Sequence, residues 1–318
     1  MEFYFQNGLA SSTQKAYNSA KKRYILFCSN KGLRPLPSSE NQLCQFVSFL
    51  ADQKLCHNTI KSYLAAIRHL HIAEGFGDPH INSMAKLEQV LKGIKSVQCK
   101  HPKRVSRLPI LPAHLVKMRE VWIREPSTFD GKMLWAASSL CFFGFFRSGE
   151  ITVPSDSSFD EGAHLSFQDV AVDCVCHPQI IKVHLKASKT DPFRVGIDIF
   201  IGKTDNKLCP VTAVLAYMVE RGAGPGPFFR FQDGKPLTRM RFVTKIKEAL
   251  TAAGMDCTSY SGHSFRSGAA TTAAKQGISD AAIKMLGRWK SSAYQLYVQT
   301  PREQLAAYSQ SLGKAIGQ

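Results

Sequence analysis

Long apolar runs are missing from this chain. No stretch of about 18 apolar residues occurs, so no segment is predicted to cross a membrane. The first residues lack the charged and then apolar pattern of a secretory signal peptide, and residues 1–8 are expected to form a short tail without structural weight. These absences argue against a membrane protein or a secreted one.

Cysteine pairs and nucleotide-binding motifs are missing as well. The nine cysteines are scattered, and the one cluster, Cys174-Val175-Cys176-His177, is too tight for the usual zinc spacing. We therefore expect reduced thiols in an intracellular protein. There is no P-loop and no paired-carboxylate motif, so the sequence predicts neither a metal nor another cofactor, and no small-molecule substrate.

Acidic residues are scarce relative to basic ones. The chain has 24 Asp and Glu against 41 Lys and Arg, a formal net charge of +17. Residues 1–107 contain 16 of the basic residues and only 6 of the acidic ones. Such a concentrated charge is typical of proteins that bind a polyanion, because neutralising phosphates releases condensed counterions. A basic surface that merely keeps the protein in solution is the alternative interpretation of charge alone.

The length of 318 residues leaves room for two domains. We predict a helical domain over residues 9–97, a linker over 98–112, and a second domain over 113–318. The linker has three prolines and four basic residues, a composition that disfavours packing into a core. The expected fold class is α+β: an all-α first domain, followed by a mostly helical domain with a small antiparallel sheet.

Hydrophobic spacing predicts the individual elements. In the first domain, Ser12 or Thr13 is expected to cap a helix, and further helices are expected over 40–55, 59–70 and 81–94. In the second domain we expect strands over 165–172, 180–185 and 194–201. Helices are expected there over 113–125, 131–146, 211–221, 238–252, 264–275, 280–286 and 291–299.

Two basic motifs in the second domain are weak when taken singly. Arg147-Ser148-Gly149-Glu150 directly follows a strongly apolar helix, where Arg147 could simply cap the helix end and pair with Glu150. Lys189 lies at the tip between two predicted strands, where most lysines are only solvated. Neither motif predicts a function by itself.

The remaining motifs lie near the end of the chain. His263 and Arg266 form an H-x-x-R at the start of an Ala-rich helix, which places both side chains on one face. A second H-x-x-R at His101 falls in the proline-broken linker. The segment Leu286-Gly287-Arg288-Trp289 is followed by Tyr294 and Tyr297, which alone look like ordinary helix residues.

The order of these motifs resembles the tyrosine recombinase (phage integrase) family. Arg, a hairpin Lys, H-x-x-R, L-G-x-W and a Tyr some ten residues later follow that family's layout over both domains. Phe-Arg-Ser-Gly-Glu, Ser-Lys-Thr-Asp-Pro-Phe-Arg and Gly-Arg-Trp-Lys-Ser-Ser-Ala are more narrowly similar to recombinases of eukaryotic mobile elements of the DIRS/Ngaro retrotransposon or Crypton type.

The resemblance implies roles that the chemistry of the side chains supports. Arg147 and Arg266 would bind the charged transition state of a phosphodiester, and Tyr297 would be the nucleophile. Lys189 would act as general acid, and His263 as base or phosphate hydrogen-bonder. Rejoining would need neither ATP nor a metal, because the covalent link keeps the bond energy.

One position departs from the family's pattern. Most members have His or Trp nine residues before the nucleophile, where this chain has Arg288, with Trp289 one residue later. We favour Trp289 as a phosphate donor and keep Arg288 as the alternative. Tyr294 is the rival nucleophile. Residues 302–318 are expected to form a terminal helix, which in this family often docks on a neighbouring protomer.

The expected partner is double-stranded DNA, held by two domains and, by resemblance to the family, by four protomers. Expected DNA-binding residues are Lys61, Arg68 and His69 on one helix face, and Lys103, Arg104 and Arg107 in the linker. The eukaryotic resemblance implies a nuclear location. A type IB topoisomerase would use the same chemistry, and a domesticated DNA-binding protein without catalysis is the alternative from another class.

Overall fold

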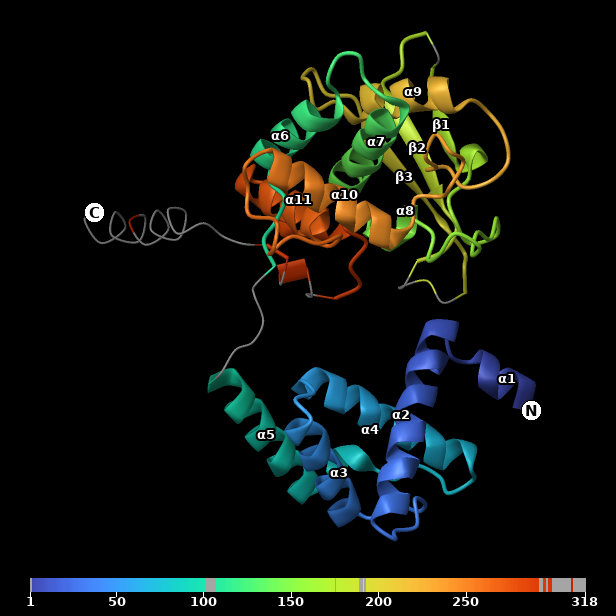
Figure 1. The fold of residues 1–318 in the computed structure, drawn as a ribbon, viewed down its shortest axis with the longest axis vertical. Coiled ribbons are helices and arrows are strands. Elements are labelled where there is room, and N and C mark those ends of the chain that lie inside the picture. The colour runs from blue at the N-terminus through green and yellow to red at the C-terminus, as the bar shows by residue number, and fades with distance from the viewer. Residues whose placement is uncertain are drawn as a thin grey trace. The chain divides into compact units, whose positions relative to one another are not determined.

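The computed structural model describes residues 2–100, 107–174, 176–188, 191, 193–291, 294–295, 297–298 and 310 (Figure 1). It divides into two compact units, Met1–Arg104 and Val105–Gln318, which are taken separately here. The division falls within residues 98–112, the segment with the composition of a linker. None of the described helices combines the length and hydropathy that a bilayer crossing requires.

The first unit is a small helical bundle. Its elements are α1 (Glu2–Asn7), α2 (Ser11–Asn30), α3 (Glu40–Asp52), α4 (His57–Ala73), η1 (Ile81–Ser83) and α5 (Ala85–Lys100). α2 packs on α4 and α3 on α5, around the fully buried side chains of Tyr24, Leu43, Phe46 and Ile60. Ser39 caps α3 by accepting a hydrogen bond from the Gln42 amide.

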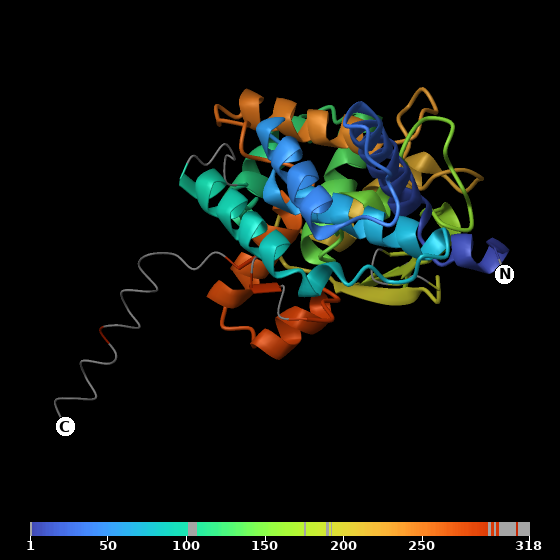
Figure 2. The same ribbon diagram turned by 90° about the horizontal axis from the view of Figure 1, so that it is seen from below.

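Three expectations for this unit were wrong in detail. Residues 2–7 form helix α1, which lies at the edge of the unit in both ribbon views (Figures 1 and 2). The N-cap of α2 is Ala10, so Ser12 and Thr13 lie inside the helix. α5 continues to Lys100, past residue 97, because Gln98 binds both the His57 amide and the Leu55 carbonyl and so ties the end of α5 to the start of α4.

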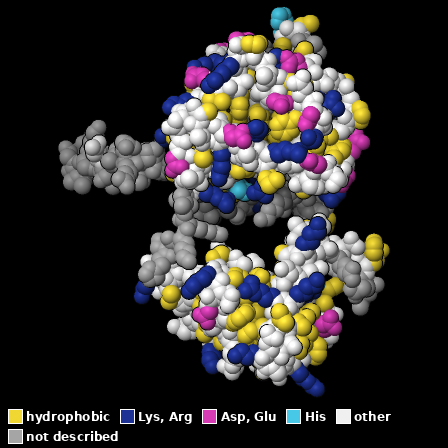
Figure 3. Space-filling view, viewed as in Figure 1, with side chains coloured by type: hydrophobic (Ala, Val, Ile, Leu, Met, Phe, Trp, Pro, Cys, Tyr) yellow, Lys and Arg dark blue, Asp and Glu magenta, His cyan; other side chains and the backbone are white. Residues whose placement is uncertain are grey.

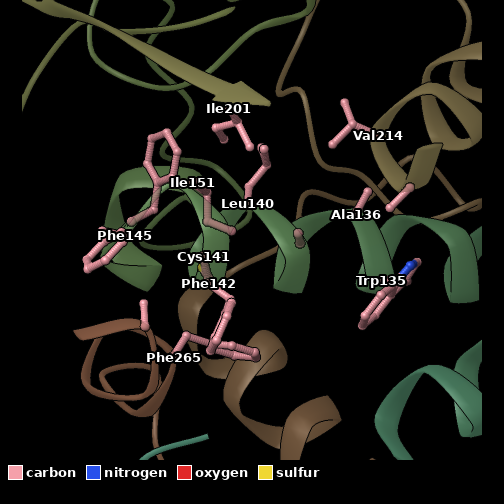
Figure 4. Packing of buried hydrophobic residues seen from close by; sticks show 14 of the residues in the cluster. Trp135, Ala136, Leu140, Cys141, Phe142, Phe145, Ile151, Ile201, Val214 and Phe265 are labelled. Atoms are coloured by element: carbon pink, nitrogen blue, oxygen red, sulfur yellow. The ribbon is translucent and has the colours of Figure 1, made fainter. Parts of the chain in front are cut away.

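The second unit surrounds one strongly apolar helix. α7 (Phe129–Phe143) is buried along almost its whole length, as its composition predicted, and packs against α9 (Pro210–Arg221), α11 (Ser264–Lys275) and α6 (Pro112–Trp122). Figure 4 shows Leu140 and Ile201 on one side of α7, and Phe265 of α11 on the other. The remaining helices are α8 (Ser148–Ile151), η2 (Phe167–Asp169), α10 (Arg239–Ala252) and α12 (Asp280–Leu286).

A small antiparallel sheet completes this unit. Its strands are β1 (Val170–Val172), β2 (Ile180–Leu185) and β3 (Ile197–Gly202), in the order β1-β2-β3. Val183 in the middle strand is paired with Val170 on one side and Ile199 on the other. Alternate residues of β2 are buried, as expected of a strand with one face on a core. The predicted α+β fold is therefore confirmed.

Most helix bounds of the second unit agree with hydrophobic spacing, but the segment 291–299 does not. Tyr294 and Gln295 lie in a 3₁₀ turn, and the Tyr297 amide donates to the Tyr294 carbonyl at 2.8 Å. That i to i−3 bond is typical of a tight turn and not of an α-helix. The expectation of an α-helix here was wrong for the described residues. The expected terminal helix over 302–318 lies outside the described residues, apart from Gln310.

Candidate active site

Arg147 lies at a sharp change of chain direction after α7. The helix ends at Phe143, Gly144 is its C-cap, and Phe145 takes a left-handed conformation with φ of 52°. Arg147 is the N-cap residue of the short α8, so it does not cap the C-terminus of α7. Its Nη1 donates to Glu150 Oε1 at 2.6 Å, and its side chain is 17% exposed. The turn therefore presents a partly accessible guanidinium held by a carboxylate.

Arg266 is fully buried on the first turn of α11. Its Nη1 donates to the Phe145 carbonyl at 2.5 Å and its Nη2 to the Gly287 carbonyl. It therefore links the Arg147 turn to the Gly287 turn, although the three segments are far apart in the sequence. Burial, and then the charge of Arg147, lower the pKa of Arg266 to about 9, so the guanidinium stays charged at neutral pH.

His263 immediately precedes α11, and its loop packs directly on the Arg147 motif. A Cβ on Gly262 would lie 2.2 Å from Ser148 Oγ, so only glycine allows this approach. Among the described residues, the buried Nδ1 of His263 has no hydrogen-bond partner. Burial lowers the pKa of His263, and the Arg239 and Arg107 guanidiniums lower it further. At neutral pH the imidazole is therefore uncharged and has a free polar atom.

Arg288 and Trp289 turn in different directions. Arg288 has a left-handed φ of 54° and donates to the Gly144 and Phe145 carbonyls and to Glu150. The Trp289 ring is 8% exposed and lies over the Arg266 guanidinium, 4.2 Å from its central carbon. A Cβ on Gly287 would lie 1.5 Å from the Trp289 ring, which explains the glycine before this pair.

Tyr297 lies beside this cluster, on a backbone anchored to α11. Ser267 Oγ and Thr271 Oγ1 donate to its carbonyl at 2.9 and 3.2 Å. Its ring centre is 5.3 Å from that of Trp289, and its side chain is partly exposed. Tyr294 is 6% exposed, and hydrogen bonding to the Asp280 carboxylate raises its pKa. The rival tyrosine is thus buried and held in its neutral form.

The predicted general acid, Lys189, lies outside the described residues. Lys186, at the end of β2, is engaged with the Asp169 carboxylate at 2.7 Å, and this ion pair is largely buried. Asp191, just after the tip, accepts a hydrogen bond from the Gly196 amide at 2.9 Å. That bond lowers the pKa of Asp191, and the charge of Lys290 contributes to the shift.

The expected DNA-binding residues differ in whether their positive charge is available to bind a phosphate. On α4, Lys61 is exposed, whereas the Nε–H of Arg68 donates a bifurcated hydrogen bond to the two carboxylate oxygens of Asp78, at 3.0 and 2.9 Å. His69 packs against Phe5, and burial lowers its pKa, so it is uncharged at neutral pH. Lys103 and Arg104 lie outside the described residues, and Arg107 is exposed.

One basic residue near His263 was missed by sequence reasoning. Arg239 is the first residue of α10 and is exposed, and it has the largest electrostatic effect of any side chain on His263. Thr238 ahead of it caps the helix, and hydrophobic spacing did predict a helix from residue 238, but not that its first turn lies near His263. Figure 3 shows that Lys and Arg side chains are spread over the faces of both units.

No cluster of three or more potential metal ligands occurs among the described His, Cys, Asp and Glu side chains. All nine cysteines are free thiols. The arrangement brings two guanidiniums, an uncharged imidazole and a phenol to one place. It is suited to binding a phosphate and forming an ester with it.

Comparisons with known proteins agree with this reading of the fold. No family model matches the chain. An integrase/recombinase XerD homolog from Selenomonas ruminantium is 26% identical over 295 residues, covering 89% of this chain and 79% of the relative.

Two solved structures extend the likeness to the fold. The Tn1549 transposon integrase in complex with circular-intermediate DNA has a TM-score of 0.59 at 13% identity. The match covers 95% of this chain and 94% of the Tn1549 integrase chain. A lambda integrase dimer bound to a core site has a TM-score of 0.56 at 17% identity. The match covers 94% of this chain and 75% of the lambda integrase chain. The chain is therefore similar in sequence to an integrase/recombinase and similar in fold to two integrases.

Proposed function

We propose that this protein cleaves and rejoins duplex DNA through a 3′-phosphotyrosyl intermediate on Tyr297, in site-specific recombination or in integration of a mobile element. One observation carries the proposal. α11 bears His263 and Arg266 at its start, its hydroxyls hold the Tyr297 backbone, and Arg266 binds the carbonyl two residues before Arg147. A single helix therefore organises residues that are up to 150 positions apart in the chain.

The chemistry follows from the charges at this site. Arg147 and Arg266 would stabilise the negative charge that a phosphodiester gains in the transition state. Tyr297 would attack phosphorus while the 5′-oxygen of the next nucleotide leaves, and Lys189 would donate the proton that this oxygen needs. His263, uncharged at neutral pH, would hydrogen-bond the phosphate or accept the phenolic proton. Rejoining is the same reaction in reverse.

The likeness to integrases supports DNA as the partner, since the Tn1549 and lambda integrase structures contain DNA. A tetramer on two DNA sites remains part of the proposal, and so do an origin in a eukaryotic mobile element and a nuclear location. The tetramer rests on the resemblance to the family. The eukaryotic origin and the nuclear location rest on the motifs Phe-Arg-Ser-Gly-Glu, Ser-Lys-Thr-Asp-Pro-Phe-Arg and Gly-Arg-Trp-Lys-Ser-Ser-Ala.

The test is formation of a covalent protein–DNA adduct. Labelled, nicked duplexes of pooled random sequence are incubated with the protein in EDTA, and label that survives denaturation is measured on the protein. Tyr297→Phe should abolish the adduct. Tyr294→Phe is the matched control and should retain it, because Tyr294 is only 6% exposed.

The other outcomes separate the alternatives. Loss of the adduct in Tyr294→Phe alone, with the variant still folded, would transfer the nucleophile to Tyr294. Salt-sensitive duplex binding without any adduct would favour a domesticated DNA-binding protein. An adduct accompanied by relaxation of supercoiled plasmid by monomers would favour a topoisomerase.

A further inference from the structure

Glu150 is a buried carboxylate shared by two arginines. Its side chain is 5% exposed. Oε1 accepts from Arg147 Nη1 at 2.6 Å, while Oε2 accepts from the Arg147 amide at 2.9 Å and from Arg288 Nη2 at 3.1 Å. A carboxylate bound in this way fixes the orientation of both guanidiniums, because each charge-assisted bond is directional. Arg147 and Arg288 are therefore coupled through one side chain.

Arg288 directs its donors into the protein. Nη1 donates to the Gly144 carbonyl at 2.9 Å, and Nη2 donates to the Phe145 carbonyl at 3.2 Å as well as to Glu150. The guanidinium also lies over the Phe146 ring, 5.1 Å from its centre, and the side chain is only 11% exposed. Its planar fork is thus matched to acceptors on the turn that leads into Arg147.

The Phe145 carbonyl is a second group that binds two arginines. It accepts from Arg266 Nη1 at 2.5 Å as well as from Arg288. Phe145 has a φ of 52°, a left-handed conformation that costs free energy for an aromatic residue and persists only where the surroundings enforce it. Two guanidiniums holding one carbonyl supply that enforcement. Arg288 consequently acts on Arg266 as well as on Arg147.

We infer that Arg288 is a positioning residue of the cleavage site: through Glu150 and the Phe145 carbonyl it orients Arg147 and Arg266, and it does not itself bind the scissile phosphate. The inference rests on the proposed function, because it assigns Arg288 a part in the same reaction. It also gives Arg288 and Trp289 different roles, because Arg288 points into the turn, whereas Trp289 covers Arg266.

The test compares three variants in the full chain. Arg288→Met removes the charge at similar length and leaves Glu150 its bonds to Arg147. Arg288→Lys keeps a positive charge but lacks the planar fork with which Arg288 binds two carbonyls and Glu150 in a fixed geometry. Arg241→Met is the matched control: Arg241 lies in the same unit and donates to both oxygens of another carboxylate, Asp156, at 2.7 Å.

Two readouts depend on DNA. In single-turnover reactions with nicked duplexes, Arg288→Met should form the adduct roughly 100-fold more slowly, because displaced reacting groups lose orientation. Arg288→Lys should recover part of the rate, and Arg241→Met should keep it. The slope of log affinity against log salt should be the same in Arg288→Met as in the unsubstituted protein. A slope reduced by about 0.9 would make Arg288 a phosphate ligand and overturn the inference.

A third readout needs no catalysis. Arg288→Met, Glu150→Gln and the double variant are compared in denaturant unfolding, where coupled residues give non-additive changes in stability. Additive changes, or a full adduct rate in Arg288→Met, would overturn the positioning role. If the unsubstituted protein forms no adduct, the proposed function fails, whereas the unfolding cycle and the salt slope still decide the role of Arg288.

Discussion

The guanidinium carbon of Arg266 lies 4.2 Å from the centre of the Trp289 ring, and Arg266 has no exposed surface. Its two Nη atoms are bonded to carbonyls, and its buried Nε has no partner among the described residues. A phosphate bound by Arg266 would therefore have to approach the Nε edge or displace the Trp289 ring. The indole is both part of the core and a cover on the arginine.

Trp289→Ala should lower the free energy of unfolding by about 3–5 kcal/mol, because a buried tryptophan leaves a large cavity and Arg266 loses its cation–π partner. Trp289→Phe should cost less, since an aromatic face remains over the guanidinium. Denaturant unfolding measures both changes. Equal and small effects in the two variants would mean that Trp289 does not pack on Arg266 in solution.

The sequence predicted the architecture of the second unit better than the directions of its side chains. Hydrophobic spacing placed α11 and α12 at the residues where they begin and end. It favoured Trp289 over Arg288 as the phosphate donor, but it could not show that the two side chains take different directions. The left-handed φ of Arg288 sends these neighbouring side chains to opposite sides, and no periodic pattern carries that information.

Polar partners that are distant in the sequence could not be predicted from it either. The helix face with Lys61, Arg68 and His69 looked uniformly basic, yet Asp78 pairs with Arg68 from a loop ten residues later. Residues 2–7 and 291–299 were misjudged for a different reason. Both are short, and packing rather than local propensity decides the conformation of such segments.

Gly268 in α11 is required by a close contact with another segment. A Cβ there would lie 1.8 Å from the Ile110 carbonyl oxygen, so Gly268→Ala should separate α11 from the strand-like residues that lead into α6. We expect a loss of about 1–3 kcal/mol in unfolding free energy. Gly93 in α5 is the matched control, because a Cβ there meets nothing within 4 Å. Gly93→Ala should stabilise the protein by about 0.5–1 kcal/mol, and thermal unfolding compares the two.

The uncharged state of His263 predicts a pH dependence of stability. Burial first, and then Arg239 and Arg107, lower its pKa in the folded protein. The unfolded chain therefore binds a proton that the folded protein excludes, and stability falls as the pH decreases below about 6.5, the ordinary histidine value. In His263→Gln the loss of unfolding free energy between about pH 8 and about pH 5.5 should be smaller.

The control for this measurement is the exposed His177, since His177→Gln leaves the buried site intact. Its pH dependence should match that of the unsubstituted protein. An unchanged acid-side loss of stability in His263→Gln would mean that the imidazole is not held neutral by burial and its cationic neighbours.

DNA binding by the first unit should depend on Lys61 more than on Arg68, although both lie on α4. Arg68 already donates to the Asp78 carboxylate, and this hydrogen bonding holds the pKa of Asp78 at about 2, so the pair carries little net charge. Lys61 is exposed and available to a phosphate. Lys61→Ala should reduce the slope of log affinity against log salt by about 0.9, and Arg68→Ala should change it less. Asp78→Asn should free the Arg68 guanidinium and tighten binding to a duplex of arbitrary sequence.

Titrations with duplex DNA at several salt concentrations test all three variants. Weaker binding by Asp78→Asn would show that the Arg68–Asp78 ion pair shapes the DNA-binding surface and does not mask the charge of Arg68.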